Sequence, residues 1–363
     1  MSNYHSFIDE WDEATKWIGK AEEVGEKTRN YVAITNALAF RGSFLTDTGK
    51  IDDGLPLWHK ALEVAIQHEL YDDAIVCLVN LAIYSYPRNL AKAREYGVRR
   101  LELCKQVNDI SGVAGGLRYL AFLDWLKGDW TAAKDEIKRT FEIWNPLGLP
   151  VTDSITYMVE VLLSLEMESL EKTESEAQRA IESTKGSPKI TDIVFGRFGL
   201  GLIREAQGKW EEAERNYLQC VDAFKKWEFT SFPLFHIETL VHLASIAAKR
   251  GDLQKARENT QWAKRLAEQL QSNAGLAMAS QGEALVLAAA GDKEAAKETY
   301  QKCLDLWERA GWPYYQAKAI IEYSDMVDKG TARQKLEHAT QILRRLGATR
   351  TLEKVQTKLS TLS

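Results

Sequence analysis

The chain has 363 residues, of which 45% are apolar and 27% charged, and its formal net charge is −5. This composition is that of a folded globular protein, and the absence of a basic block argues against direct nucleic-acid binding. The longest uninterrupted apolar run, Ala284 to Ala290, is far too short to span a bilayer.

The N-terminus lacks the basic-then-apolar arrangement of a secretory signal. The four cysteines lie at least 27 residues apart and form no C-x-x-C motif. Widely spaced cysteines at helical positions are typical of reduced, packed thiols. We therefore expect a cytoplasmic protein that is not membrane-bound and holds no metal through its cysteines.

Residues 5–28 are predicted to form a helix that corresponds to the second helix of a helix pair, with no first helix before it. Their apolar residues recur at helical spacing, with Ala14, Ile18 and Ala21 on one face. We expect residues 1–30 to be an N-terminal half-repeat or a cap.

Eight helix pairs are predicted between residues 31 and 345. Prolines stand just before three of the first helices, at Pro150, Pro233 and Pro313, where a missing N–H costs nothing. No hairpin signal indicates a strand. The predicted pairs are 31–46 with 52–68, 71–85 with 89–106, 110–127 with 130–144, 152–167 with 171–184, 191–206 with 210–226, 234–249 with 253–270, 274–289 with 293–310, and 314–328 with 331–345.

A three-point frame of small residues recurs through these pairs. Ala121 is followed seven residues later by Gly128 and five after that by Ala133. Gly tolerates the left-handed conformation that ends a helix, and the small residues let the two helices of a pair cross closely. The same frame is filled by Gly42, Gly49 and Gly54; by Gly201, Gly208 and Ala213; by Ala244, Gly251 and Ala256; and by Ala284, Gly291 and Ala296.

This frame resembles the tetratricopeptide repeat over nearly the whole chain. The resemblance implies an all-α, right-handed α-solenoid, which we expect to be a single domain over 1–363 with a capping helix in 346–363. We place the turns at 49, 88, 128, 172, 208, 251, 291 and 330, a mean step of about 40 residues. The usual tetratricopeptide period is 34, so the helices or connections here are longer.

The long period and the stretches 307–314 and 343–348 look like the superhelix of maltose-activator-like bacterial regulators and signalling ATPases. That resemblance implies a non-catalytic sensor or scaffold that binds a protein or peptide and belongs to a larger regulatory protein. A stand-alone peptide receptor of quorum-sensing type is the alternative. An enzyme with a site in the groove is a third reading, from a different class.

The sequence shows no motif typical of a catalytic, metal-binding or phosphate-binding site. The six histidines show no metal-binding spacing, and neither H-E-x-x-H nor a G-x-S-x-G elbow occurs. The glycine-rich stretch 196–201 falls inside a predicted helix. We therefore predict no catalytic residue, no metal site and no cofactor.

The candidate binding site is the concave face, which first helices line in tetratricopeptide stacks. Counting back from each turn glycine places aromatic residues and one arginine in the middle of this groove, and exposed aromatics with an arginine favour a binding hot spot. The alternative is that neighbouring repeats bury these side chains. The predicted partner-binding residues are Arg118, Phe122, Trp125, Tyr157, Phe195, Phe198, Glu238 and Gln281.

Overall fold

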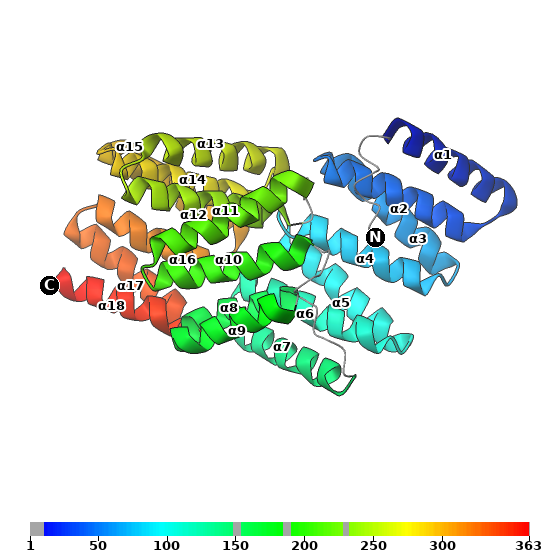
Figure 1. Ribbon diagram of the computed structural model, residues 1–363, viewed down its shortest axis with the longest axis horizontal. Coiled ribbons are helices and arrows are strands. Elements are labelled where there is room, and N and C mark those ends of the chain that lie inside the picture. Colours follow the sequence, from blue (N-terminus) through cyan, green and yellow to red (C-terminus); the bar gives the residue numbers. More distant parts are fainter. Residues whose placement is uncertain (1–10, 148–153, 184–189, 228–231, 363) are drawn as a thin grey trace.

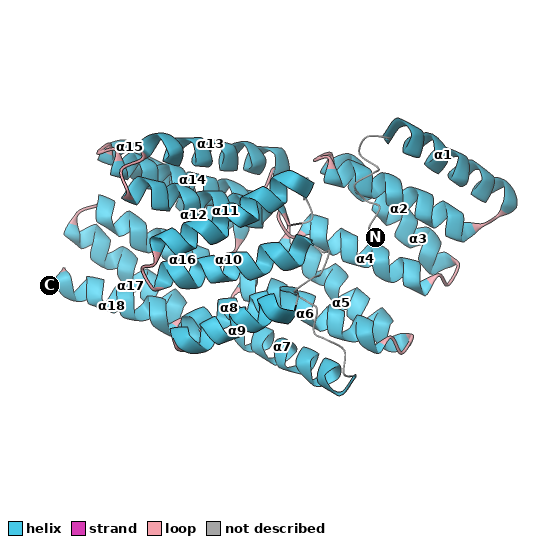
Figure 2. Cartoon of the chain, in the orientation of Figure 1, coloured by secondary structure: helices cyan, strands magenta, loops and turns pink. Residues whose placement is uncertain are grey.

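The computed structural model describes residues 11–147, 154–183, 190–227 and 232–362 and is helical without a strand over these ranges (Figures 1 and 2). The all-α solenoid is therefore confirmed. The α-helices are α1 (Trp11–Thr28), α2 (Tyr31–Asp47), α3 (Ile51–Gln67), α4 (Tyr71–Ser85), α5 (Leu90–Gln106), α6 (Ile110–Lys127), α7 (Trp130–Trp144), α8 (Ser154–Met167), α9 (Leu170–Ser183), α10 (Ile190–Ala206), α11 (Trp210–Trp227), α12 (Pro233–Lys249), α13 (Leu253–Leu270), α14 (Asn273–Ala289), α15 (Lys293–Ala310), α16 (Pro313–Tyr323), α17 (Lys329–Leu346) and α18 (Thr349–Thr361).

Within the described residues, α2 to α17 form eight antiparallel pairs, with α1 before them and α18 after them. The first part of the predicted 5–28 helix, residues 5–10, lies outside the described residues, as does Pro150. Pro233 and Pro313 begin α12 and α16, as predicted.

The turn chemistry explains where the helices end. Gly128 has φ 88°, so it ends α6 in the left-handed region, and the Asp129 carboxylate then accepts the Ala132 amide at 3.2 Å to cap α7. The glycines at 49, 208, 251 and 291 also have positive φ. These five predicted turns are confirmed.

The small residues lie where the helices of a pair cross. Ala121 and Ala133 are fully buried between α6 and α7. At Gly201 a Cβ would lie only 2.4 Å from the ring of Tyr217, so only glycine lets α10 approach α11 this closely.

Two predicted turns are wrong. Lys172 lies inside α9, because the Ser169 hydroxyl caps that helix earlier by accepting the Lys172 amide at 3.3 Å. Gly330 lies in the first turn of α17, because the Asp328 carboxylate caps that helix by accepting the Thr331 amide at 3.0 Å. Both caps are polar side chains, which need no glycine.

The stack of pairs curls so that its two halves meet. The Arg88 guanidinium, which follows α4, donates to the side chain of Gln271 at 3.2 Å, and Ser272 donates to the carbonyl of Pro87. Arg350, near the start of α18, donates to carbonyls at the end of α8. Figure 1 shows α1 to α3 at one end of the molecule and α17 and α18 at the other. The predicted C-terminal cap thus also contacts the fourth pair.

Candidate functional site

The aromatic residues predicted to line the groove are on first helices, as expected, but they are buried. Phe122 and Trp125 lie on α6, and Phe195 and Phe198 lie on α10. Trp125 is 3% exposed and Phe198 is 0% exposed. The expectation that these side chains form an exposed surface is therefore wrong.

Phe235, on α12, is the side chain that covers three of these aromatics. Its ring centroid lies 5.9 Å from that of Phe122, 4.8 Å from that of Phe195 and 5.3 Å from that of Phe198. Such distances are typical of packed aromatic pairs. A helix three pairs further along the chain than α6 therefore fills the space that an open groove would leave beside it.

Trp125 is covered in the same way by the start of α16. Its ring centroid lies 6.0 Å from that of Tyr314 and 5.8 Å from that of Tyr315. Phe122, Trp125, Phe195 and Phe198 therefore belong to one continuous buried core and form no exposed surface. Whether any of them contacts a partner stays a prediction, and such contact would require the first helices to separate.

Arg118 and Tyr157 lie away from this core. The Arg118 guanidinium is half-buried, 5.7 Å from the ring centroid of Trp144, and Tyr157 is buried 5.6 Å from the ring centroid of Phe141. The structure therefore does not place Arg118 beside Phe195 or Phe198 to receive a partner's carboxylate.

Glu238 and Gln281 are buried and already hydrogen-bonded. Glu238 accepts a hydrogen bond from the Tyr315 phenol at 3.0 Å. The Gln281 amide donates to Glu322 at 2.7 Å and accepts from the Trp307 indole at 3.3 Å. Both residues lie on first helices, but their hydrogen bonds join α12 and α14 to neighbouring helices.

A charged pair lies beside Glu238. His242 Nδ1 is 2.7 Å from a carboxylate oxygen of Glu205, which also accepts the Tyr217 phenol at 2.9 Å. Despite burial, the charge and hydrogen bond of Glu205 raise the pKa of His242 to about 9. Despite its own burial, the charge of His242 lowers the pKa of Glu205 to about 2. The pair is therefore ionised at neutral pH and joins α10 to α12.

The first helices of the first two pairs keep apolar side chains in solvent. Gly42 and Thr46 pack α2 against α3, and Phe40, 54% exposed, points to the opposite side of α2. On α4, Val76 is 51% exposed. Sequence reasoning missed both residues, because counting back from the turns selected other positions on these helices.

A cavity of about 160 Å³ lies at the ends of α2 and α4. Asp47 follows Phe40 by seven residues and Ile83 follows Val76 by seven, a spacing that keeps each pair on one face. Asp47 and Ile83 both line the cavity, and so does His236 of α12, whose Nε2 has no hydrogen-bond partner. We call this surface, from Phe40 and Val76 to the cavity, the open inner face.

Comparison with known proteins shows which folds this architecture resembles. A tetratricopeptide-repeat family model matches residues 282–306, which include the turn at Gly291. Among solved structures, the chain is similar to a Rap protein complexed with competence and sporulation factor, with 13% identity, a TM-score of 0.59 and 100% of both chains covered. The chain is a tetratricopeptide-type superhelix.

The superhelix is also similar to a STAND protein, a signal-transduction ATPase with numerous domains, from Pyrococcus horikoshii, which has a tetratricopeptide repeat sensor. The identity is 14% and the TM-score 0.54, over 94% of this chain but only 53% of that one. No curated protein sequence matches this chain. At these identities the likeness shows the fold.

Over residues 11–147, 154–183, 190–227 and 232–362, the superhelix has no group of three side chains that could hold a metal ion. In the same ranges no helix has the length and apolarity needed to cross a membrane. All four cysteines are free and buried. Burial raises the pKa of the Cys77 thiol to about 12, so this thiol is a packing group at neutral pH.

Proposed function

We propose that this superhelix is a non-catalytic scaffold that binds a protein or peptide on its open inner face. The observation that supports this proposal is that Phe40 and Val76 are exposed on the first helices α2 and α4, whose ends at Asp47 and Ile83 line a cavity. Exposed apolar groups next to a pocket are typical of binding surfaces. The similar Rap protein, which carries a bound factor in its solved complex, supports a binding role.

An apolar segment is the ligand that fits this surface. Phe40 and Val76 offer apolar contact area, and the cavity beyond them has room for one side chain. Burial lowers the pKa of His236 to about 4, so the imidazole is neutral and its unpartnered Nε2 can accept or donate one hydrogen bond. The proposal needs no direct nucleic-acid or membrane contact and places the chain in the cytoplasm.

Two regulatory roles fit such a scaffold. The first is the sensor part of a larger bacterial signalling protein, which the likeness to part of the STAND protein supports. The second is a stand-alone peptide receptor, which the full coverage of the Rap chain supports. The reading frame around this segment of the gene would separate the two roles.

A peptide-display library selected against the wild-type chain tests the binding site. We expect selected peptides to carry an apolar anchor and to lose at least about tenfold in affinity for Phe40→Ser and Val76→Ser, because truncating an anchor contact typically costs more than 1 kcal/mol. Leu218→Ser is the matched control, since Leu218 is an exposed apolar residue on the second helix α11. Peptides that bind both Ser variants of the open inner face as tightly as wild type would refute the site.

A further inference from the structure

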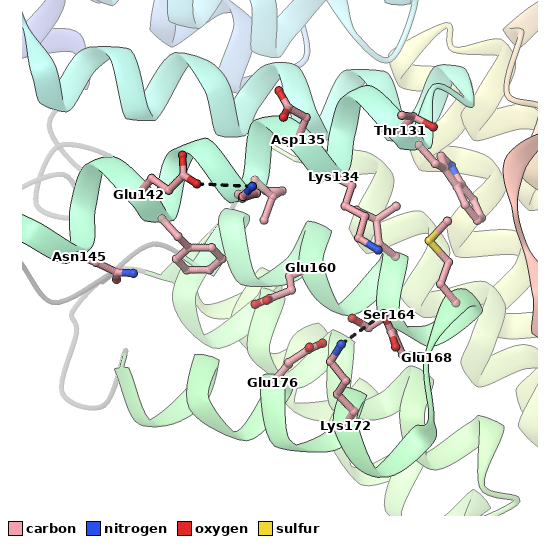
Figure 3. Close-up of a pocket in the computed structure, with 16 residues that line it drawn as sticks. Thr131, Lys134, Asp135, Glu142, Asn145, Glu160, Ser164, Glu168, Lys172 and Glu176 are labelled. Carbon is pink, nitrogen blue, oxygen red and sulfur yellow. Dashed lines mark ion pairs between the residues drawn. The ribbon is translucent and has the colours of Figure 1, made fainter.

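A second cavity, of about 620 Å³, opens between α7 on one side and α8 and α9 on the other (Figure 3). It lies between the third and fourth helix pairs, away from the open inner face, and we call it the inter-repeat cavity. Its volume is in the range of small-ligand sites. Part of its lining is apolar, from Trp130, Ile137, Phe141, Leu163 and Met167.

Two carboxylates in this cavity each have one oxygen without a hydrogen-bond partner. Glu176 of α9 is only 5% exposed, and its Oε2 accepts no hydrogen bond. Glu160 of α8 is half-buried, and its Oε2 likewise accepts none. Figure 3 shows both carboxyl groups within the cavity, near one another. Buried oxygens without donors are costly, so this arrangement is not explained by stability.

Among the described residues, the lysines around the cavity form no ion pair with Glu160 or Glu176. Lys138 is 3.7 Å from Glu142, and Lys172 is 3.2 Å from Glu168, so both lysines have partners at the rim. Lys134 is exposed and forms no ion pair among the described residues.

Arg179, a mostly exposed residue, approaches Glu160 only to 3.8 Å. Burial, together with the charge of Glu176, therefore raises the pKa of Glu160 to about 7.

We propose that the inter-repeat cavity binds an organic cation, an ammonium or guanidinium group carried on an apolar segment, as in a Lys or Arg side chain of a peptide. The cation would donate hydrogen bonds to the free oxygens of Glu160 and Glu176, and its stem would lie on the apolar lining. Two carboxylates are too few to form a calcium site, which takes six to eight oxygen ligands. An organic cation also fits the volume, which a bare ion would leave largely empty.

Two matched tripeptides test the proposal on the full chain by titration calorimetry. The first is Leu-Arg-Leu, acetylated and amidated, and the second is the same peptide with neutral citrulline in place of arginine. We expect the arginine peptide to bind wild type with a Kd below about 1 mM and the citrulline peptide to bind at least about tenfold more weakly, because charge-assisted hydrogen bonds are the stronger ones.

Glu160→Gln and Glu176→Gln should each weaken arginine-peptide binding about tenfold. Both variants should fold, because Glu176 has a buried oxygen without a hydrogen-bond partner and Glu160 has only a long ion pair with Arg179, so each substitution removes little favourable interaction. Their thermal midpoints, expected to be at or above that of wild type, verify this. Glu142→Gln is the matched control, because Glu142 is on the same rim but is exposed and paired with Lys138; it should leave the affinity unchanged.

Butylguanidinium distinguishes the two sources of the cation. Tighter binding of the tripeptide assigns the cavity to a peptide side chain, and equal binding assigns it to a small organic amine; both support a cation site. Absence of binding by both cationic probes at millimolar concentration would overturn the proposal. Equal affinity of the arginine and citrulline peptides, or an unchanged affinity in Glu176→Gln, would do the same.

Discussion

The phenol of Tyr314 donates a hydrogen bond of 2.8 Å to a carboxylate oxygen of Glu166, joining α16 to α8 across 148 residues of sequence. The amide and the hydroxyl of Thr351, in α18, each donate to the same carboxylate at 3.0 Å. Glu166 is buried, and these three bonds satisfy it. Glu166 therefore joins the last pair and the final helix to the fourth pair. The same helix α16 carries Tyr314 and Tyr315, which bury Trp125 of α6.

Glu166→Ala is therefore expected to destabilise the chain by about 2–4 kcal/mol, because three buried donors lose their acceptor. Tyr314→Phe should cost less, about 1 kcal/mol, since Glu166 keeps its two bonds from Thr351. Urea denaturation followed by circular dichroism measures both changes. If the two variants lost the same free energy of unfolding, this explanation would be wrong, because Glu166 should keep its two hydrogen bonds from Thr351 in Tyr314→Phe.

The fold could be predicted because its signals are local. A glycine that ends a helix and an aspartate that caps the next, as at Gly128 and Asp129, act within five residues of sequence. Caps of other chemistry, such as Ser169, were missed because a hydroxyl before a helix is also common in loops.

The candidate site could be predicted only in part. The phase of α6 correctly placed Phe122 and Trp125 toward the inside of the superhelix. Their burial depends on Phe235 and Tyr315, which are more than 100 residues away and reach α6 only because the stack of pairs curls upon itself. A repeat pattern describes neighbouring pairs and contains no information on such distant contacts.

The crossings within pairs provide a second prediction. Ala121→Leu or Ala244→Leu should destabilise the chain by about 1–3 kcal/mol, because both methyl groups are fully buried where two helices meet. Glu211→Ala should cost less than about 0.5 kcal/mol, since that side chain is 80% exposed and its ion pair with Arg250, at 3.1 Å, is on the surface. Denaturant unfolding of the three variants checks this, and similar costs for all three would mean that the helix phase is wrong.

Glu136 provides a third prediction. It is buried on α7 with one oxygen unpartnered, and burial, together with the charge of Asp124, raises its pKa to about 8. Because the folded pKa exceeds the unfolded value, the folded chain loses stability as pH rises from about 4.5 to about 8. Glu136→Gln should thus differ little from wild type at pH 5 and be more stable by roughly 2–4 kcal/mol at pH 8. Asp135→Asn, on the exposed side of the same helix, should show no such trend.

The ion pair of His242 and Glu205 provides the last prediction. Its contribution to stability is lost at high pH through His242 and at low pH through Glu205. The folded pKa of His242 is raised to about 9, so its contribution to stability is complete below about pH 6.5 and is lost as pH rises through 9. The folded pKa of Glu205 is lowered to about 2, so its contribution is complete above about pH 4.5 and is lost as pH falls through 2. Both contributions are therefore complete between about pH 4.5 and 6.5.

His242→Gln should cost on the order of 2–3 kcal/mol at pH 6, and this cost should shrink as pH rises toward 9, since wild type then loses the same charge. The charged groups that act on His242 are Glu205 of α10, Glu238 of α12 and Lys318 of α16, so their ionisation must be constant over the titrated range. Denaturant unfolding of wild type, His242→Gln, Glu205→Gln and the double variant at pH 6 and pH 9 measures the coupling between the pair. A coupling free energy that is the same at both pH values would contradict an ionised pair, because a neutral hydrogen bond between the two side chains would not titrate in this window.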